Sequence, residues 1–308
     1  MADKAYAAAP ESELQNNAKR FSPPSGRHSG VFSLLFRLWR LSARMDMLWL
    51  LRDTRTCLLV MTSDLIGNAA GMAGILLLSA RFDGIGGMSQ DQVLFMLGYA
   101  ACIDGLFMLF FGMVNTGYIS RVIGRGQLDH MLIQPVPLPV QLLTAGFIPF
   151  SGSSLLICGL GVTGYAAARL DMWGNPTWVL GMGINLAASV AVILAFSYII
   201  GSSAFYAPVA GEEVSSAAIA FFDVTKRFPL GGLPLPMQVV FCTVLPAGLV
   251  AWLPTARLMN LPAAGLPAFF LVLSALVLGT IATFVFRKGL KQYAKYGSQR
   301  YSDHGHRR

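Results

Sequence analysis

The sequence predicts an all-α, polytopic integral membrane protein, and three of its features support that fold class. Of the 308 residues, 55% are hydrophobic and only 12% are charged, whereas soluble domains contain about 25% charged residues. The mean hydropathy is +0.58. Several apolar runs are long enough to cross about 30 Å of hydrocarbon at about 1.5 Å per helical residue. These features indicate one membrane domain and no large soluble one.

Basic residues are concentrated at both ends of the chain. Residues 1–55 contain nine Lys or Arg against five acidic residues, and residues 287–308 contain seven against one. Cytoplasmic segments carry such a basic excess, so we expect both termini in the cytoplasm, which requires an even number of spans. Residues 1–28 are polar and lack the apolar core of a signal peptide. We expect them to form a disordered cytoplasmic tail, 29–290 the membrane domain, and 291–308 a basic cytoplasmic tail.

The segment 31–55 predicts a basic amphipathic helix. At about 100° per residue, its arginines share one side while Phe, Trp and Leu fill the rest. These arginines are Arg37, Arg40, Arg44, Arg52 and Arg55. Such a helix lies in the membrane interface with its arginines toward anionic lipid headgroups. Lipid sensing is one possible role, and an elbow that leads into the first span is the simpler one.

Six transmembrane helices are expected, and five of them fall on clear apolar runs. These runs are about 56–80, 92–117, 140–168, 177–206 and 265–286. The remaining span is ambiguous, because Pro246 and Pro254 each remove a backbone donor from the apolar run 237–258 and clash with the preceding turn. In one threading of the chain through the membrane, 212–230 crosses as the fifth span, and 237–258 enters and leaves the membrane on the outer side. In the other, 237–258 crosses and 207–236 is a cytoplasmic loop.

The segment "GRGQLDHMLIQPVPLP", residues 124–139, separates the second and third expected spans. Gly124 and Gly126 are expected to end the preceding helix, and Pro135 stops the next one after about two turns. The result is a short helix at the cytoplasmic mouth of the bundle. Its apolar edge would be Leu128, Leu132 and Ile133, and its polar edge Asp129 and His130. This segment is either an ordinary polar loop in which a helix ends, or a short helix on which a cytoplasmic partner docks.

Two motifs carry a resemblance to a known family. The first is Gly-x-Leu-Asp-x-x-Leu-x-x-Pro, which starts at Gly126 and ends at Pro135. The second is "FPLGGLPLPMQVVFCTVLPAGLVAWLPTARLM" at 228–259, with prolines at Pro229, Pro236, Pro246 and Pro254. Both resemble type-2 ABC exporter permeases, most closely those described as ABC-2 family transporter proteins. The order of the motifs and the six-span layout agree with that family across about residues 30–290.

The resemblance implies a permease subunit of an ATP-driven exporter in a bacterial-type cytoplasmic membrane. It would work as a homodimer or as a heterodimer with a homologous permease, in contact with membrane lipid. The loop 119–135 would be the coupling helix that docks on a separate ATPase subunit, through Arg121, Arg125, Gly126, Leu128, Asp129, Leu132 and Pro135. The family also has a re-entrant helical pair before the last span, broken here at the four prolines, which favours 212–230 as the fifth span.

No catalytic or metal-binding constellation is expected in this chain. A Walker A phosphate loop needs Gly-Lys followed by Ser or Thr, and none of the six lysines has Ser or Thr after it or Gly before it. We therefore expect no cofactor here, with ATP and Mg bound by the partner subunit. The four cysteines stand singly in apolar runs and three of the four histidines lie in the tails, so no metal site is expected. No nucleic-acid partner is expected either.

Three polar residues lie inside expected spans. Asp64 and Asn68 are one turn apart in the first span, and Asp104 is near the middle of the second. An ionised Asp at that depth costs roughly 2.5–3.5 kcal/mol on insertion scales. These residues either line a translocation path or hydrogen-bond between helices. The alternative function, a self-contained ion-coupled transporter or channel, would use the two aspartates. "GNAAG" at 67–71 is interpreted as a site of close helix packing.

Overall fold

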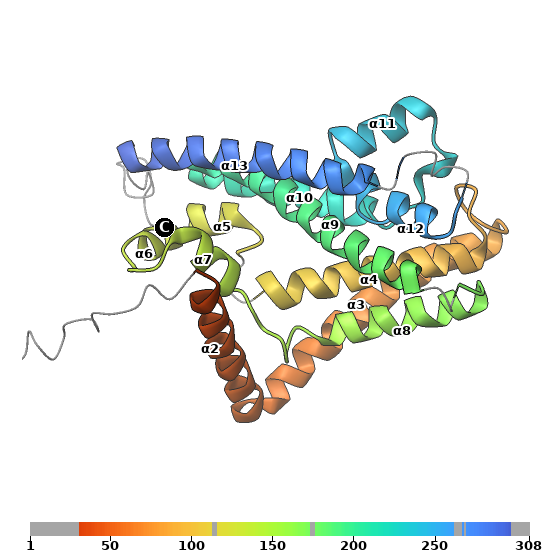
Figure 1. Cartoon of the computed structure of the whole chain (residues 1–308), viewed down its shortest axis with the longest axis horizontal. Coiled ribbons are helices and arrows are strands. Elements are labelled where there is room, and N and C mark those ends of the chain that lie inside the picture. The colour runs from red at the N-terminus through yellow and green to blue at the C-terminus, as the bar shows by residue number, and fades with distance from the viewer. Residues whose placement is uncertain (1–30, 113–115, 173–175, 262–266, 268, 297–308) are drawn as a thin grey trace, which may run out of the picture.

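The computed structural model describes residues 31–112, 116–172, 176–261, 267 and 269–296, and this part of the chain is helical and contains no strand (Figure 1). The predicted all-α class is confirmed. The expected disordered tail at 1–28 and the last twelve residues of the expected basic tail lie outside the described residues.

Four of the described helices are long and apolar enough to cross a membrane. They are α3 (Thr54–Arg81), α4 (Gln90–Phe111), α9 (Pro176–Gly201), which continues into the 3-10 turn η1 (Ser202–Phe205), and α13 (Phe270–Tyr296). Their positions agree with the first, second, fourth and last predicted spans. α13 continues past residue 290, so the first residues of the expected C-terminal tail are helical.

The third predicted span, 140–168, is wrong as a single helix. α7 (Leu138–Thr144) ends early, and α8 (Ser154–Arg169) begins only after a non-helical stretch. Pro149 lies in that stretch and cannot donate a helical hydrogen bond. Gly146 also approaches α4 closely, since a Cβ there would lie 2.7 Å from Phe111 Cα. The chain therefore breaks where it passes the end of α4.

Of the described helices, α4 and α8 share the most extensive contact. Three glycines allow this approach: a Cβ on Gly98 would lie 2.7 Å from Thr163 N, one on Gly105 2.5 Å from Leu156 Cα, and one on Gly159 2.5 Å from Cys102 N. Small residues let helix backbones meet in this way inside a membrane, where van der Waals packing drives association. α4 is accordingly the most buried of the four long helices.

The two ends of the bundle are built differently. At one, called the α6 end, α5 (Ile119–Gly124), α6 (Gln127–Leu132) and α7 lie beside η1 and the C-terminal part of α13 (Figure 1). At the other, called the α12 end, the turn between α3 and α4 meets η2 (Leu230–Gly232), and a Cβ on Gly86 would lie 2.8 Å from Pro229 O.

The apolar run before the last span is divided into two half-helices, as expected from its prolines. α11 (Leu235–Thr243) and the segment Pro246–Leu258, which contains η3 (Pro246–Leu249) and α12 (Trp252–Leu258), are bent by 77°. The pair begins just after η2 and ends beside Trp178, whose Nε1 donates a 3.2 Å hydrogen bond to Leu258 O. Trp178 is near the start of α9, so both ends of the pair lie at the α12 end.

The four predicted breaker prolines have different places in this pair. Pro229 precedes η2, Pro236 is in the first turn of α11, Pro246 begins η3, and Pro254 is in the first turn of α12. A proline in a first turn loses no helical hydrogen bond, because the N–H there has no partner within the helix. Pro246 is therefore the proline at the bend, while Pro236 and Pro254 start helices.

α10 (Pro208–Thr225) connects the two ends of the bundle. It has 18 residues, about 27 Å at 1.5 Å per residue. It packs on α5 and η1 near its start and also contacts η3. α10 thus leads from one end toward the other, and the bent pair leaves and rejoins the same end. The first of the two predicted threadings requires such a path of α10 and of the bent pair.

α2 (Val31–Arg52) lies across the bundle near α7 (Figure 1). Its one buried residue is Asp46, which is 1% exposed. The Asp46 carboxylate accepts hydrogen bonds from Phe150 N at 2.7 Å, Ser151 N at 3.1 Å and Ser151 Oγ at 2.6 Å. α2 thereby satisfies backbone donors in the non-helical stretch between α7 and α8, which would otherwise be unpaired.

Candidate functional site

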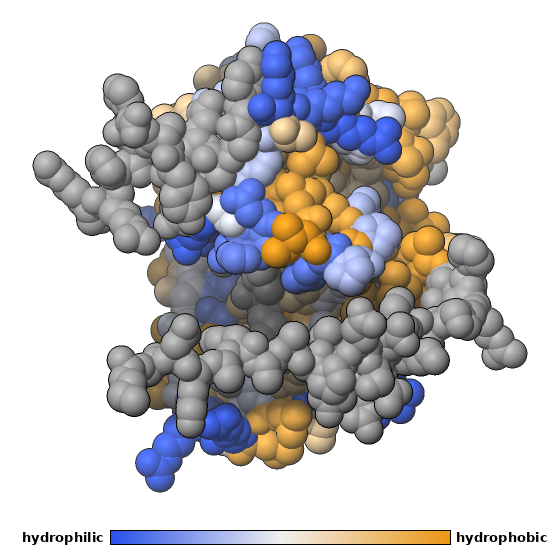
Figure 2. All heavy atoms as spheres, turned by 90° about the vertical axis from the view of Figure 1, so that its left-hand side faces the viewer, coloured by the Kyte–Doolittle hydropathy of each residue, from blue (hydrophilic) through white to orange (hydrophobic). Residues whose placement is uncertain are grey.

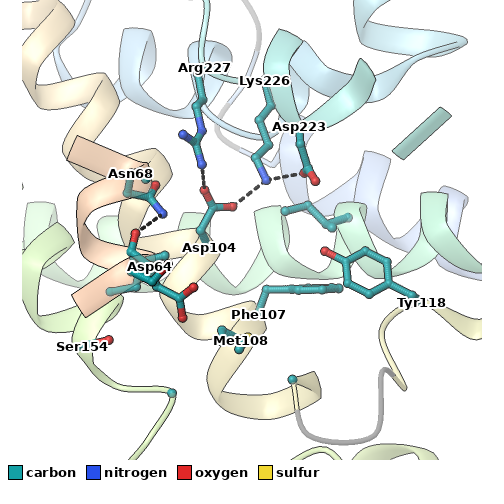
Figure 3. A pocket seen from close by; sticks show the side chains of 16 residues that line it. Asp64, Asn68, Asp104, Phe107, Met108, Tyr118, Ser154, Asp223, Lys226 and Arg227 are labelled. Carbon is teal, nitrogen blue, oxygen red and sulfur yellow. Dashed lines mark hydrogen bonds and ion pairs between the residues drawn. The ribbon is translucent and has the colours of Figure 1, made fainter. Parts of the chain in front are cut away.

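A cavity of about 420 Å³ lies in the middle of the bundle, between α3, α4, α8, α9 and the end of α10. Its polar lining is Ser63, Asp64, Asn68, Asp104, Tyr118, Ser154, Asp223, Lys226 and Arg227 (Figure 3). The predicted pathway residues Asp64, Asn68 and Asp104 all line it, so the fold brings these three together although two helices supply them.

Four charged side chains form a cluster in this cavity. Lys226 Nζ donates to Asp104 Oδ1 at 2.5 Å and to Asp223 Oδ1 at 2.7 Å, and Arg227 Nη2 donates to Asp104 Oδ2 at 2.8 Å (Figure 3). The side chains of Lys226 and Asp104 are 4% and 13% exposed. Charges at this depth are tolerated only when they are paired. Asp104 therefore ties α4 to α10 by ionic bonds.

The other three members of the cluster, of which Lys226 and Arg227 bond Asp104 and Asp223 bonds Lys226, were missed in the sequence. Asp223, Lys226 and Arg227 lie at the end of α10, where Lys226 is the C-cap residue. Cations are favoured there because the helix dipole places partial negative charge at the C-terminus. The spacing of Asp223 and Lys226 gave a usable signal, since an acid and a base three residues apart share one helix face. Nothing indicated that Asp104 would be the partner of Lys226 and Arg227.

The aspartate of α3 has a different environment. Asn68 Nδ2 donates to the backbone oxygen of Asp64 at 3.4 Å. In the described part of the chain, the Asp64 carboxylate takes part in none of the ion pairs or hydrogen bonds. Among the described residues, the expected close packing on "GNAAG" is absent at Gly67, where a Cβ would meet nothing within 4 Å. Gly71 instead makes room for Arg227, because a Cβ on Gly71 would lie 3.0 Å from Arg227 Nη1.

Aromatic side chains form another wall of the cavity. Phe107 and Tyr118 lie with their ring centroids 5.5 Å apart in an edge-on arrangement. Burial raises the pKa of the Tyr118 phenol above its ordinary value. The group is therefore neutral at physiological pH and keeps its proton as a hydrogen-bond donor.

The predicted two-turn helix at 127–132 is present as α6. Gly126 precedes it at φ +69°, a left-handed conformation that favours glycine. Gly124 ends α5 and lies against α10, since a Cβ there would meet Glu212 Oε2 at 2.8 Å and Pro208 O at 3.0 Å. Pro135 lies beyond the end of α6, as expected.

The seven residues predicted for the docking loop divide into two groups. Leu128 is fully buried, and Asp129 Oδ1 accepts a 2.5 Å hydrogen bond from Tyr293 OH of α13. Arg125 pairs with Glu212 of α10 at 3.3 Å, and the Arg121 guanidinium lies 5.4 Å from the centroid of the Tyr118 ring. These side chains, together with Gly126, fix α5 and α6 on the bundle.

The second group faces outward. Leu132 is 44% exposed, its neighbour Ile133 is 81% exposed, and Pro135 is also exposed. Figure 2 looks onto the α6 end and shows hydrophobic side chains near its centre with hydrophilic ones around them. We call Leu132, Ile133 and Pro135 the α6 tip. Exposed apolar side chains rimmed by polar ones are typical of a surface that binds a protein.

A family model described as "ABC-2 family transporter protein" matches residues 65–297, more than half of the chain. The chain belongs to the ABC-2 transporter family. The resemblance found in the two motifs is thus confirmed, and both motifs fall within the matched residues. Comparisons with curated proteins and with solved structures gave no match. α2 and the start of α3 precede the matched region.

Membership in the ABC-2 family, together with the long apolar helices, identifies a multi-pass membrane protein of the transport machinery. Proteins of this family are membrane components of ABC transporters and generally not catalytic. Among the residues that the structure describes, no group of three or more His, Cys, Asp or Glu could hold a metal ion.

Proposed function

We propose that this ABC-2 protein is the permease subunit of an ATP-driven exporter in a bacterial-type cytoplasmic membrane, with ATP hydrolysed on a separate subunit. The α6 tip carries the proposal. It is an exposed apolar surface on α6, which is bonded to α13 through Asp129–Tyr293, while the turn just before α6 is bonded to α10 through Arg125–Glu212. A partner that moved α6 would therefore move both helices.

In this proposal the chain crosses the membrane six times. α8 and α10 supply the two crossings beyond the four long apolar helices, and the bent pair α11–α12 is re-entrant from the outer side. The α6 end is then cytoplasmic, and the start of α2 and the end of α13 lie there (Figure 1). α10 tolerates its charged residues because Glu212 lies at the α6 end and Asp223 joins the cluster on Asp104.

α2 is proposed to lie in the cytoplasmic membrane interface. It crosses the direction of the other long helices in Figure 1 and exposes large apolar side chains, among them Phe32, Phe36 and Leu48. Its arginines are exposed as well. A helix with apolar and basic exposed faces is suited to the boundary between headgroups and acyl chains.

The geometry suggests how ATP could drive transport. ATP binding closes the ATPase dimer and shifts the α6 tips of two permease copies. α10 is held at its start by Arg125 and by the contact with Gly124, and about 27 Å further on it presents Lys226 and Arg227 to the cavity. Movement of α6 is thus passed to the charge cluster and biases the cavity toward one of two open states.

A charge at the α6 tip tests the ATPase partnership. Ile133→Asp should leave membrane insertion and thermal unfolding unchanged but abolish co-purification of the ATPase, because desolvating a carboxylate opposes an apolar contact. Phe82→Asp is the matched control, since Phe82 is 72% exposed at the opposite end of the bundle. The candidate partners are soluble chains with a Gly-Lys-Ser/Thr phosphate loop encoded beside this gene. Equal co-purification with wild type and Ile133→Asp would contradict the proposal.

A transport assay on the same preparation distinguishes the proposed exporter from the alternative function. An ion-coupled transporter would move its substrate as the purified chain alone, driven by an ion gradient. The exporter shows no transport in proteoliposomes until the ATPase and ATP are added.

A further inference from the structure

We propose that the central cavity binds the positively charged group of an amphipathic organic cation. This inference rests on the proposed export function and names the substrate class of its cavity. Three carboxylates, those of Asp64, Asp104 and Asp223, line the cavity together with two cations, Lys226 and Arg227. One negative charge is therefore left uncompensated in the cavity.

The uncompensated charge belongs to Asp64. Both cations are bonded to Asp104, and Lys226 also to Asp223. The Asp64 carboxyl group, by contrast, points into the cavity (Figure 3) and has no ionic or hydrogen-bonded partner among the described side chains. A carboxylate that stays unpaired among apolar helices is unfavourable. A bound cation would supply the missing partner.

The aromatic wall favours an organic cation over a metal ion. Phe107 and Tyr118 line the same cavity as Asp64. Faces of aromatic rings attract alkylammonium and related cations and, together with a carboxylate, form the usual site for such groups. A hard metal ion would need several oxygen ligands, and the described residues hold no cluster that provides them.

The ligand also needs an apolar part. A second cavity of about 510 Å³ lies between α3 and α10 and shares Asp223 and Arg227 with the first. The rest of its lining is apolar or small: Ala70, Gly71, Gly74, Ile75, Leu78, Val224 and Phe228. A hydrocarbon body can occupy this space while the cationic group reaches Asp64.

An anionic ligand does not fit the same geometry. Lys226 is 4% exposed and already donates to two carboxylates, and Arg227 donates to a third carboxylate oxygen. A phosphate or carboxylate ligand would have to displace these bonds and would face Asp64 as a like charge, which is strongly unfavourable in a low-dielectric site.

The test uses two ions of nearly equal shape and opposite charge, tetraphenylphosphonium and tetraphenylborate. Binding of each is measured to the purified chain in nanodiscs, with empty nanodiscs to subtract partition into lipid. The wild-type chain should bind the phosphonium saturably and the borate at least about tenfold more weakly. Asp64→Asn should lose about tenfold or more in phosphonium affinity, and Asp64→Glu should retain most of it.

Asp91→Asn is the control, because Asp91 is an acid at the α12 end, outside both cavities. Its phosphonium affinity should equal that of the wild type, and the thermal unfolding midpoint of Asp64→Asn should confirm that this variant is folded. Equal binding of the two ions, or unchanged affinity in Asp64→Asn, would overturn the proposal. The assay needs neither ATP nor a partner, so phosphonium binding without ATP-driven export would contradict the proposed function and leave this inference standing.

Discussion

The Tyr293 hydroxyl of α13 donates a 2.5 Å hydrogen bond to Asp129 Oδ1 of α6, across 164 residues of sequence. Asp129 belongs to the loop motif shared with ABC-2 proteins, and an acidic residue in a docking loop suggests direct contact with the partner. Here the carboxylate is turned toward the bundle instead. Its role in this structure is to hold α6 on α13.

Tyr293→Phe should loosen α6 without changing its exposed surface. The variant removes a hydrogen bond to a carboxylate, worth about 1.5–3 kcal/mol, and should lower the thermal unfolding midpoint of the chain in detergent. Because the α6 tip is intact, the ATPase should still co-purify, while transport per ATP hydrolysed falls. A double-mutant cycle with Asp129→Ala should give a coupling of about 0.5–3 kcal/mol. Additive effects of the two variants would mean that the bond contributes nothing.

Gly105→Ala should destabilise the bundle, whereas Gly161→Ala should not. A Cβ at Gly105 would lie 2.5 Å from Leu156 Cα, but one at Gly161 on α8 would meet nothing within 4 Å. The first variant must push α4 from α8, at a cost of about 1–3 kcal/mol. The second gains about 0.5–1 kcal/mol of helix propensity. Thermal unfolding of the two variants decides the matter, and equal midpoints would show that the helices separate freely.

Hydropathy could predict the long helices because a span in lipid must satisfy its backbone hydrogen bonds within its own segment. The length of the apolar run in the local sequence therefore indicates the span. The short helix α6 could also be predicted, since the left-handed glycine before it and Pro135 after it are local signals. The division of 140–168 was missed although Pro149 and Gly146 stood in the run. Prolines and glycines are tolerated within spans when neighbours satisfy the backbone, so their presence alone did not decide between a kink and a break.

Long-range partners could not be predicted from the sequence. Asp104 and Lys226 are 122 residues apart, and Asp46 and Ser151 are 105 apart. Nothing in the local pattern of either residue selects its partner, because each pair depends on how helices pack. For the same reason the sequence placed Leu128 and Leu132 together on one apolar edge of the helix, while the fold buries the first and exposes the second.

Asp46→Ala should release α2 from the bundle. The substitution leaves two backbone N–H groups and the Ser151 hydroxyl without their acceptor, and each unsatisfied buried group costs about 1–3 kcal/mol. Trypsin should then cleave α2 faster at Arg40 and Arg44, whereas Asp46→Asn, which keeps one acceptor oxygen, should show a smaller increase. Asp53→Ala is the control, because Asp53 only caps the start of α3 through Thr56 N. Wild-type cleavage rates in Asp46→Ala would show that these three hydrogen bonds do not hold α2 on the bundle.

Asp104→Asn should be strongly destabilising, and Lys226→Met should partly rescue it. Removing one member of a buried ionic cluster leaves uncompensated charge and costs about 3–5 kcal/mol, whereas replacing both partners by uncharged groups of similar size is far less costly. The folded yield after detergent extraction and the thermal unfolding midpoint measure the effect. Asp91→Asn breaks an exposed pair with Arg169, and should change neither quantity noticeably because exposed pairs contribute little. If Asp104→Asn unfolded at the wild-type temperature, the cluster would not hold α4 to α10, and the proposed path from α6 through α10 to the cavity would lose its last connection.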